Sequence, residues 1–207
     1  MQPNAVTNEA IRRDISRVII TREQISGRVK SLAEQIAECY LSDQPSDRTE
    51  ITILAVLTGS LVFLADLIRR LPMKIRIDVV SASSYPGPRT SAAELALQIP
   101  SDMDLKGKHV LVVDDILDSG QTLDAILAAV SQHGPLSLKS CVLLAKKFPE
   151  RPEPARCDFV GFVIEPEFVV GYGLDYGDLY RNLPEICTLT PEAIAAGRAR
   201  PAKGTRQ

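Results

Sequence analysis

The feature of this sequence that most limits its possible folds is the alternation of short apolar runs with longer stretches of helical periodicity. Most of the apolar runs are strand-sized and bounded by turn residues, and apolar residues three and four apart follow them. We predict strands over residues 51–57, 75–83, 109–114, 138–145, 159–164 and 168–170. We predict helices over residues 25–41, 61–71 and 123–132, the first of them opened by a capping box of Thr21 and Gln24.

Strands that alternate with helices form crossover units around a mostly parallel sheet. The nearly continuous apolar strands agree, because helices cover both faces of such a sheet. The expected fold class is therefore α/β, a three-layer, mostly parallel twisted sheet flanked by helices. Residues 1–14 are expected to be a frayed polar tail, and residues 190–207, with four basic residues and one acidic residue, a solvated basic tail.

The composition excludes several classes of protein. The 24 basic and 26 acidic residues leave a net charge of −2, so no basic field exists to hold nucleic acid or an anionic membrane. The longest uncharged run, residues 51–65, is shorter than the roughly 20 residues of a membrane-spanning helix, and no apolar secretory signal begins the chain. The four cysteines show no C-x-x-C spacing, which is typical of reduced thiols and argues against zinc. We expect a cytoplasmic location.

One stretch of the sequence predicts chemistry. A Val-rich strand ends in Asp114 and Asp115, and a short turn that begins with Asp118 opens the next helix. Ligands of open parallel sheets bind at the carboxyl ends of the strands. Neighbouring acids on a strand point to opposite sides, so one of the pair can accept from the vicinal hydroxyls of a sugar or hold hydrated Mg²⁺. Four residues would offer N–H groups to a phosphate monoester at the helix N-terminus: Ser119, Gly120, Gln121 and Thr122.

Helix capping, a P-loop and a hydrolase triad each fit this chain less well. An Asp pair often caps a helix, but three acids within five residues exceed what capping requires. A nucleoside-triphosphate site of the P-loop type is excluded because no G-x-x-x-x-G-K-[ST] sequence occurs, and the G-x-G at residues 171–173 is isolated. With only two histidines, a hydrolase triad has little support. A site for a phosphorylated sugar is the interpretation that these residues favour.

The same stretch resembles the phosphoribosyl-pyrophosphate motif of type I phosphoribosyltransferases, and the rest of the chain resembles their hypoxanthine (hypoxanthine-guanine) branch. The resemblance runs from about Ile15 to Leu189. Outside the motif it is carried by Leu57-Thr58-Gly59-Ser60, Ser84-Tyr85, Lys146, the block Phe168–Tyr176 and Tyr180-Arg181. It implies the fold of that family over residues 15–189, with a hood subdomain from the N-terminal segment and about residues 158–189, and a flexible active-site loop.

The resemblance implies an enzyme that moves the 5-phosphoribosyl group from phosphoribosyl pyrophosphate to a 6-oxopurine. Hypoxanthine, and also guanine, would be converted to IMP and GMP, with Mg²⁺ as cofactor and with a homo-oligomer, dimer or tetramer, as the assembled form. Two alternatives stay open: a regulatory protein that senses phosphoribosyl pyrophosphate on the same fold, and a xanthine phosphoribosyltransferase. The regulator would need a basic face or an added DNA-binding domain, and the chain has neither.

The resemblance also implies roles for individual residues. Asp118 would be the general base, residues 119–122 would hold the 5′-phosphate, and Asp114 and Asp115 would flank the ribose hydroxyls. The purine would contact Lys146 at its 6-oxo group, Phe168 by stacking, and the backbone of Val169. The remaining roles are pyrophosphate binding by Thr58, Gly59 and Arg181, magnesium binding by Asp175 and Asp114, and closure of the flexible loop through Ser84 and Tyr85.

Two positions depart from the family pattern. Thr58 stands where many relatives carry lysine, so the positive charge that this lysine brings to pyrophosphate is absent, as is any contact it makes between subunits. Gln121 stands where lysine is common, but anion binding by backbone N–H groups does not require that side chain.

Overall fold

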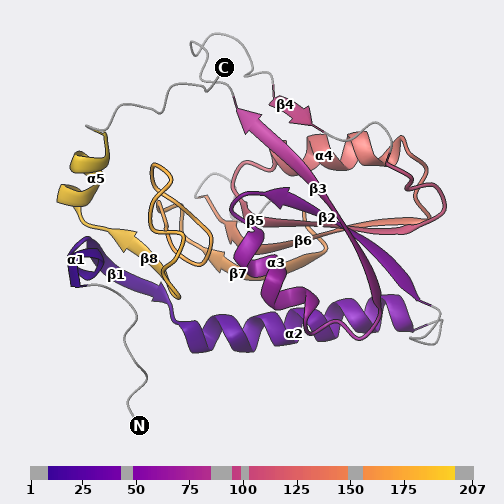
Figure 1. Ribbon diagram of the computed structural model, residues 1–207, viewed down its shortest axis with the longest axis horizontal. Coiled ribbons are helices and arrows are strands. Elements are labelled where there is room, and N and C mark those ends of the chain that lie inside the picture. The colour runs from indigo at the N-terminus through magenta and orange to yellow at the C-terminus, as the bar shows by residue number, and fades with distance from the viewer. Residues whose placement is uncertain (1–8, 43–48, 85–94, 99–102, 149–155, 199–207) are drawn as a thin grey trace. The chain divides into compact units, whose positions relative to one another are not determined.

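The computed structural model describes residues 9–42, 49–84, 95–98, 103–148 and 156–198 (Figure 1). The chain divides into two compact units. The larger unit is Gly27–Pro166, and the smaller unit joins Met1–Ser26 to Glu167–Gln207. The expected hood began near residue 158, whereas this division falls at Glu167.

The larger unit is built on a six-stranded sheet with the strand order β4-β3-β2-β5-β6-β7. All neighbouring strands are parallel except β3 and β4, which are antiparallel. The strands are β2 (Glu50–Leu57), β3 (Lys74–Ser84), β4 (Leu95–Gln98), β5 (His109–Leu117), β6 (Ser137–Lys146) and β7 (Phe159–Ile164). The prediction of a mostly parallel sheet is confirmed.

Helices cover the two faces of this sheet, as the apolar strands require. Helix α4 (Gln121–Ser131) packs on one face through its buried residues Leu123, Ile126 and Val130. These side chains share a core with alternate residues of the central strands, among them Leu54, Val56, Val110, Val112 and Val142. Helices α2 (Arg22–Leu41) and α3 (Leu61–Ile68) lie on the opposite side of the sheet (Figure 1). The three-layer arrangement follows from this placement.

Several boundaries differ from those predicted. Strand β5 extends to Leu117 instead of ending at Asp114, so Asp115 lies within the strand rather than after it. Pairing with β6 continues through this stretch, with Asp114 opposite Val142. Helix α3 ends at Ile68 instead of Leu71, because its last turn unwinds before Pro72. The predicted loop after residue 84 contains the short strand β4, which pairs with the end of β3.

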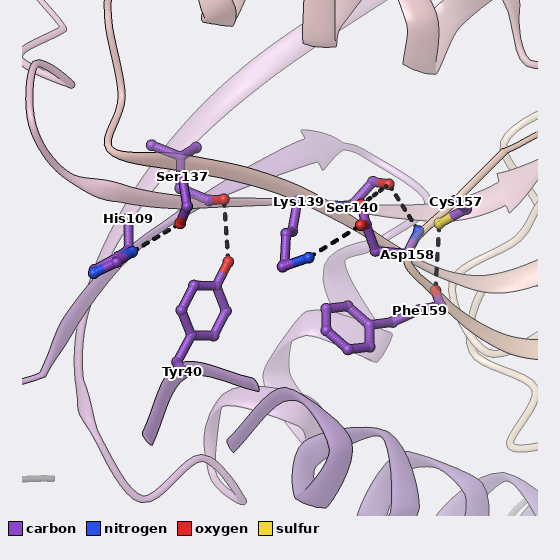
Figure 2. Close-up of polar contacts among 9 residues, drawn as sticks. Tyr40, His109, Ser137, Lys139, Ser140, Cys157, Asp158 and Phe159 are labelled. Carbon is purple, nitrogen blue, oxygen red and sulfur yellow. Dashed lines mark hydrogen bonds and ion pairs between the residues drawn. The ribbon is translucent and has the colours of Figure 1, made fainter. Parts of the chain in front are cut away.

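Polar contacts near the amino ends of β5, β6 and β7 are drawn in Figure 2. His109 Nδ1 lies 2.7 Å from Ser137 Oγ, and the Asp158 carboxylate accepts from Ser140 N and Oγ at 2.9 and 3.0 Å. Tyr40 donates its hydroxyl to the carbonyl of Val110 at 3.3 Å, and burial raises the pKa of this phenol. These contacts lie at the ends of the strands opposite to Asp118, so we interpret them as structural.

The smaller unit contains elements that the sequence analysis did not predict. Its strands β1 (Ile15–Ile20) and β8 (Ile186–Leu189) form an antiparallel pair, and its helices are α1 (Glu9–Arg13) and α5 (Pro191–Arg198). The predicted strand at 168–170 is wrong, because only Val170 makes an isolated bridge, to Cys187. Helices α1 and α5 lie in the segments for which we expected polar tails. Helix α5 begins after Thr190, whose hydroxyl accepts from Ala193 N at 3.2 Å, and Ala193 is buried.

The four cysteines are free thiols in the structure. Cys141 is fully buried in β6, and this burial raises the pKa of its thiol, which makes it unreactive. No helix within the described ranges is long and apolar enough to cross a membrane.

Candidate active site

Two adjacent aspartates lie near the carboxyl end of β5, where a parallel sheet presents its ligands. Asp114 is only 8% exposed, and its Oδ1 accepts from Asp115 N at 2.9 Å. Asp115 in turn accepts from Ile116 N at 2.8 Å through its own Oδ1. Burial raises the pKa of Asp114 well above that of an ordinary carboxyl, and the neighbouring charge of Asp115 raises it further. The ionised form of Asp114 is therefore unfavourable in the folded protein. A nearby cation or hydroxyl donors would lower the free energy of this charged form.

The Asp115 side chain lies against the turn that follows β2. A Cβ built on Gly59 would stand 1.5 Å from Asp115 Oδ2, so any side chain at position 59 would force the Asp115 carboxylate to move. The turn after β2 meets the end of β5 because β2 and β5 are parallel neighbours. In this turn Thr58 is exposed, the peptide bond from Leu57 to Thr58 is cis, and Ser60 is fully buried. The structure thus brings together two predicted sites, for ribose and for pyrophosphate, that lie far apart in the sequence.

The turn from Asp118 to Gln121 ends in the N-terminus of α4. Gly120 adopts a φ of 91°, which favours glycine, and it has no side chain with which to cap the helix. Its carbonyl accepts from Asp124 N at 2.9 Å, which starts the helical ladder two residues earlier than predicted. Ser119 Oγ lies 3.4 Å from Gln121 N. The geometry is that of a helix N-terminus preceded by a glycine turn, which suits an anion.

The predicted general base and the predicted purine contact form an ion pair. Lys146 Nζ lies 2.8 Å from Asp118 Oδ2. The lysine is the last residue of β6, and its side chain is 14% exposed, whereas that of Asp118 is 54% exposed. The neighbouring Lys147 pairs instead with Glu165 at 2.7 Å, and both of these side chains are exposed. In the Asp118–Lys146 pair a hydrogen-bond donor and an acceptor thus stand side by side at the carboxyl ends of the strands of the larger unit.

The predicted residues of the smaller unit lie on an irregular loop. Three consecutive residues of this loop, Gly171, Tyr172 and Gly173, have φ values of 97°, 51° and 103°. A Cβ on Gly171 would stand 2.0 Å from the carbonyl oxygen of Glu185, so the loop backbone is in close contact with the segment before β8. At the start of the loop Phe168 is 53% exposed while Val169 is 5% exposed. The Phe168 ring is therefore presented at a surface of this unit.

Asp175 and Arg181 contact each other within the same loop. Arg181 Nη2 lies 2.8 Å from Asp175 Oδ1, and Arg181 Nη1 donates to the carbonyl of Gly173 at 2.8 Å. The second oxygen of Asp175 accepts from Asp178 N at 2.9 Å. The arginine and the carboxylate are both about one-third exposed, so the pair is preorganised yet reachable by a polar ligand.

The fit of these residues to magnesium depends on how that ion is bound. Within the described ranges, no three His, Cys, Asp or Glu side chains gather into a metal cluster. Magnesium is usually held by one or two carboxylates together with substrate phosphates and water. Two carboxylates could serve in this way: Asp114 and Asp175. Asp114 is buried, and its charged form is disfavoured by burial and by Asp115, whereas Asp175 is partly exposed. Each of them, within its own unit, fits a magnesium ion that arrives with a phosphorylated substrate.

Two predicted residues are not placed in a site. Ser84 is the last residue of β3, and Tyr85 lies outside the described residues. Phe168 also has a partner that was not predicted from the sequence, the ring of Tyr176, whose centroid lies 5.3 Å away at an interplanar angle of 78°. Its place in the block that begins at Phe168 was visible in the sequence, but the edge-on contact depends on the fold of the loop.

Comparison with known proteins agrees with this architecture. The model of the phosphoribosyl transferase domain family matches residues 21–177. Hypoxanthine phosphoribosyltransferase of Buchnera aphidicola subsp. Schizaphis graminum is 41% identical over 171 residues, which are 82% of this chain and 93% of the relative. Hypoxanthine-guanine phosphoribosyltransferase of Aquifex aeolicus is 39% identical over 170 residues, with coverage of 82% and 92%.

The solved structures similar to this chain include members of the same family. A structure of hypoxanthine phosphoribosyl transferase from Trypanosoma cruzi has a TM-score of 0.81 at 34% identity and covers 90% of this chain and 97% of its own. A hypoxanthine-guanine phosphoribosyltransferase from Bacillus anthracis has a TM-score of 0.73 at 41% identity, with coverage of 86% and 99%. The chain therefore belongs to the phosphoribosyltransferase family and, within it, to the hypoxanthine and hypoxanthine-guanine phosphoribosyltransferases.

Proposed function

We propose that this enzyme transfers the 5-phosphoribosyl group from phosphoribosyl pyrophosphate to hypoxanthine, and also to guanine, releasing pyrophosphate. A variant of the Trypanosoma cruzi relative, 34% identical, was solved with the product IMP. The observation that carries the proposal is the glycine turn before α4 with the Asp118–Lys146 pair beside it. The same elements would hold a sugar phosphate and a purine in adjacent places.

The larger unit would bind the sugar phosphate. Residues 119–122 would donate their N–H groups to the 5′-phosphate, as the N-terminus of α4 favours. Asp114 would accept from the ribose hydroxyls, which would relieve the cost of its buried charge. Asp115, whose second oxygen lies against the Gly59 turn, would do the same. Thr58 and Gly59 would offer this turn to the pyrophosphate.

The Asp118–Lys146 pair matches one edge of a 6-oxopurine. On that edge an oxygen, which accepts, lies next to the imidazole nitrogen that carries a proton. Lys146 would donate to the 6-oxo group while Asp118 takes the proton from this imidazole nitrogen, which leaves the lone pair of the other imidazole nitrogen free to attack the sugar. An exocyclic amine at position 6 would set donor against donor, so adenine should be rejected.

The smaller unit would contribute the remaining contacts. Phe168 would stack on the purine with its exposed face, and the backbone of Val169 would contact the six-membered ring. Arg181 would bind pyrophosphate, and Asp175 would hold Mg²⁺ through water, with Asp114 as a second carboxylate for magnesium. When bound, this ion would neutralise charge that builds on the departing pyrophosphate. Ser84 and Tyr85 would close over the reacting centre.

We further propose that the enzyme acts in the cytoplasm, where free thiols such as its four cysteines stay reduced, and that it assembles as a dimer or tetramer. The relatives are named as enzymes, so the alternative of a regulatory sensor is not favoured. A xanthine phosphoribosyltransferase would differ only in a few contacts to the base.

A base-panel assay tests the proposal. The protein is incubated with phosphoribosyl pyrophosphate, Mg²⁺ and one of four bases: hypoxanthine, guanine, xanthine or adenine. We expect IMP and GMP to form, with little or no AMP, and turnover to stop in excess chelator. Formation of XMP alone would support the xanthine enzyme, and no nucleotide with any base would contradict the proposal.

A further inference from the structure

Helix α5 lies outside the segment that resembles the family, yet it is in close contact with Tyr176. The Tyr176 hydroxyl donates to the carbonyl of Ile194 at 2.9 Å. A Cβ built on Gly197 would stand 2.2 Å from Cε1 and 2.9 Å from Cδ1 of the same ring. The backbone of α5 therefore touches one side of the Tyr176 ring, and only glycine at position 197 allows this approach.

The Tyr176 ring also contacts Phe168. The two rings meet edge to face, with centroids 5.3 Å apart and planes at 78°. Phe168 is 53% exposed, so much of its ring is open to a ligand. A loosely held aromatic ring would lose rotational freedom on stacking with a purine, and a ring that already contacts a fixed neighbour loses less.

Helix α5 is itself held firmly in the smaller unit. Ala193 is buried in a core with Val170, Cys187 and Leu189, and Tyr176 and Ile194 pack against this core. Thr190 N donates to the carbonyl of Asp14 at 2.8 Å just before the helix begins. The helix is thus a fixed support for Tyr176, and every residue of this chain of contacts lies in one compact unit.

We propose that Tyr176 is a positioning residue for purine binding: α5, through Gly197 and Ile194, fixes the Tyr176 ring, and Tyr176 fixes the orientation of Phe168. The inference rests on the proposed role of Phe168 as the ring that stacks on the base. It assigns a function to the segment after Leu189, which the resemblance leaves without one.

The main test replaces Gly197 with alanine. The added methyl group displaces the Tyr176 ring, so the KM for hypoxanthine should rise about 3- to 10-fold, the scale of one aromatic pair. The KM for phosphoribosyl pyrophosphate should change less than about twofold. Gly27→Ala is the matched control, because Gly27 is an exposed helical glycine with nothing within 4 Å of its Cβ position. Equal changes in both KM values would indicate a purely structural role and overturn the proposal.

Substitutions at Tyr176 test the effect of this ring on Phe168 without introducing a steric clash. Tyr176→Leu removes the edge contact and should raise the KM for hypoxanthine as much as Gly197→Ala does. Tyr176→Phe keeps the ring and loses only the hydrogen bond to Ile194, so it should restore most of the purine affinity. If Gly197→Ala does not fold, this pair decides the question, and an unchanged KM in Tyr176→Leu would overturn the proposal.

A double-mutant cycle separates this inference from the function on which it rests. In a Phe168→Ala background, Gly197→Ala should cause no further rise in the KM for hypoxanthine, because the ring that it acts through is gone. If Phe168→Ala alone leaves this KM unchanged, the stacking role of Phe168 is wrong, and the inference is overturned with it. If Phe168→Ala raises the KM but Gly197→Ala and Tyr176→Leu do not, only the inference is overturned.

Discussion

The strand-end region of the larger unit and the loop of the smaller unit hold their candidate residues by different means. Around Asp118 the backbone follows a parallel sheet and a helix N-terminus, and regular hydrogen bonds between strands set each position. Around Phe168 the backbone passes through consecutive positive φ values and is held by contacts to β8 and the segment before it. In the first region regular secondary structure determines where each residue lies. In the second region contacts between segments far apart in the chain determine it.

The largest effect that we expect is on the strand-end region. Asp118→Asn keeps the size of the side chain but removes the base, so turnover should fall about 100-fold or more while phosphoribosyl pyrophosphate still binds. Steady-state kinetics and calorimetric titration measure the two quantities. Asp78→Asn, which changes an exposed aspartate of β3, is the control. Undiminished turnover in Asp118→Asn would remove this residue from the mechanism.

A pair of glycine substitutions tests the dependence of the loop on packing. Gly171→Ala introduces a Cβ 2.0 Å from the Glu185 carbonyl oxygen at a φ of 97°, and we expect it to destabilise the protein by about 2 kcal/mol or more. Gly177→Ala, at a φ of 60° with open space around it, should cost only about 1 kcal/mol. Urea unfolding measures both, and equal losses would show that close packing does not hold this loop.

The next effect concerns base selectivity in the strand-end region. Lys146→Ala should raise the KM for hypoxanthine about 10-fold and reduce the discrimination against adenine, because the donor to the 6-oxo group is lost. Lys147→Ala is the matched control, since Lys147 pairs with an exposed glutamate. Selectivity that stays unchanged in Lys146→Ala would mean that another donor reads position 6.

The smallest effect that we expect is on stability and depends on pH. Because burial raises the pKa of Asp114, the folded protein holds that proton more tightly than the unfolded chain. Stability should therefore decrease as the pH rises from the ordinary carboxyl range through the raised pKa. In chelator, Asp114→Asn should be more stable than the wild type at neutral pH, with the difference vanishing in acid. A variant that is less stable at neutral pH would contradict the assigned shift.

These two regions also explain what the sequence could predict. The apolar runs and the acidic turn located the sheet and the Asp118 segment, because strand and helix periods are local properties. The strand at 168–170 was wrong and helix α5 was missed, because neither has a periodic pattern of its own. The contact between Gly59 and Asp115 joins residues far apart in the chain and required the strand order of the sheet.

The most direct test of the account is a crystal structure of the protein soaked with ribose 5-phosphate. We predict that the phosphate lies at the N-terminus of α4, within hydrogen-bond distance of the N–H groups of residues 119–122, with the sugar hydroxyls toward Asp114 and Asp115. A sugar phosphate bound elsewhere, with that turn contacting only solvent, would contradict the account.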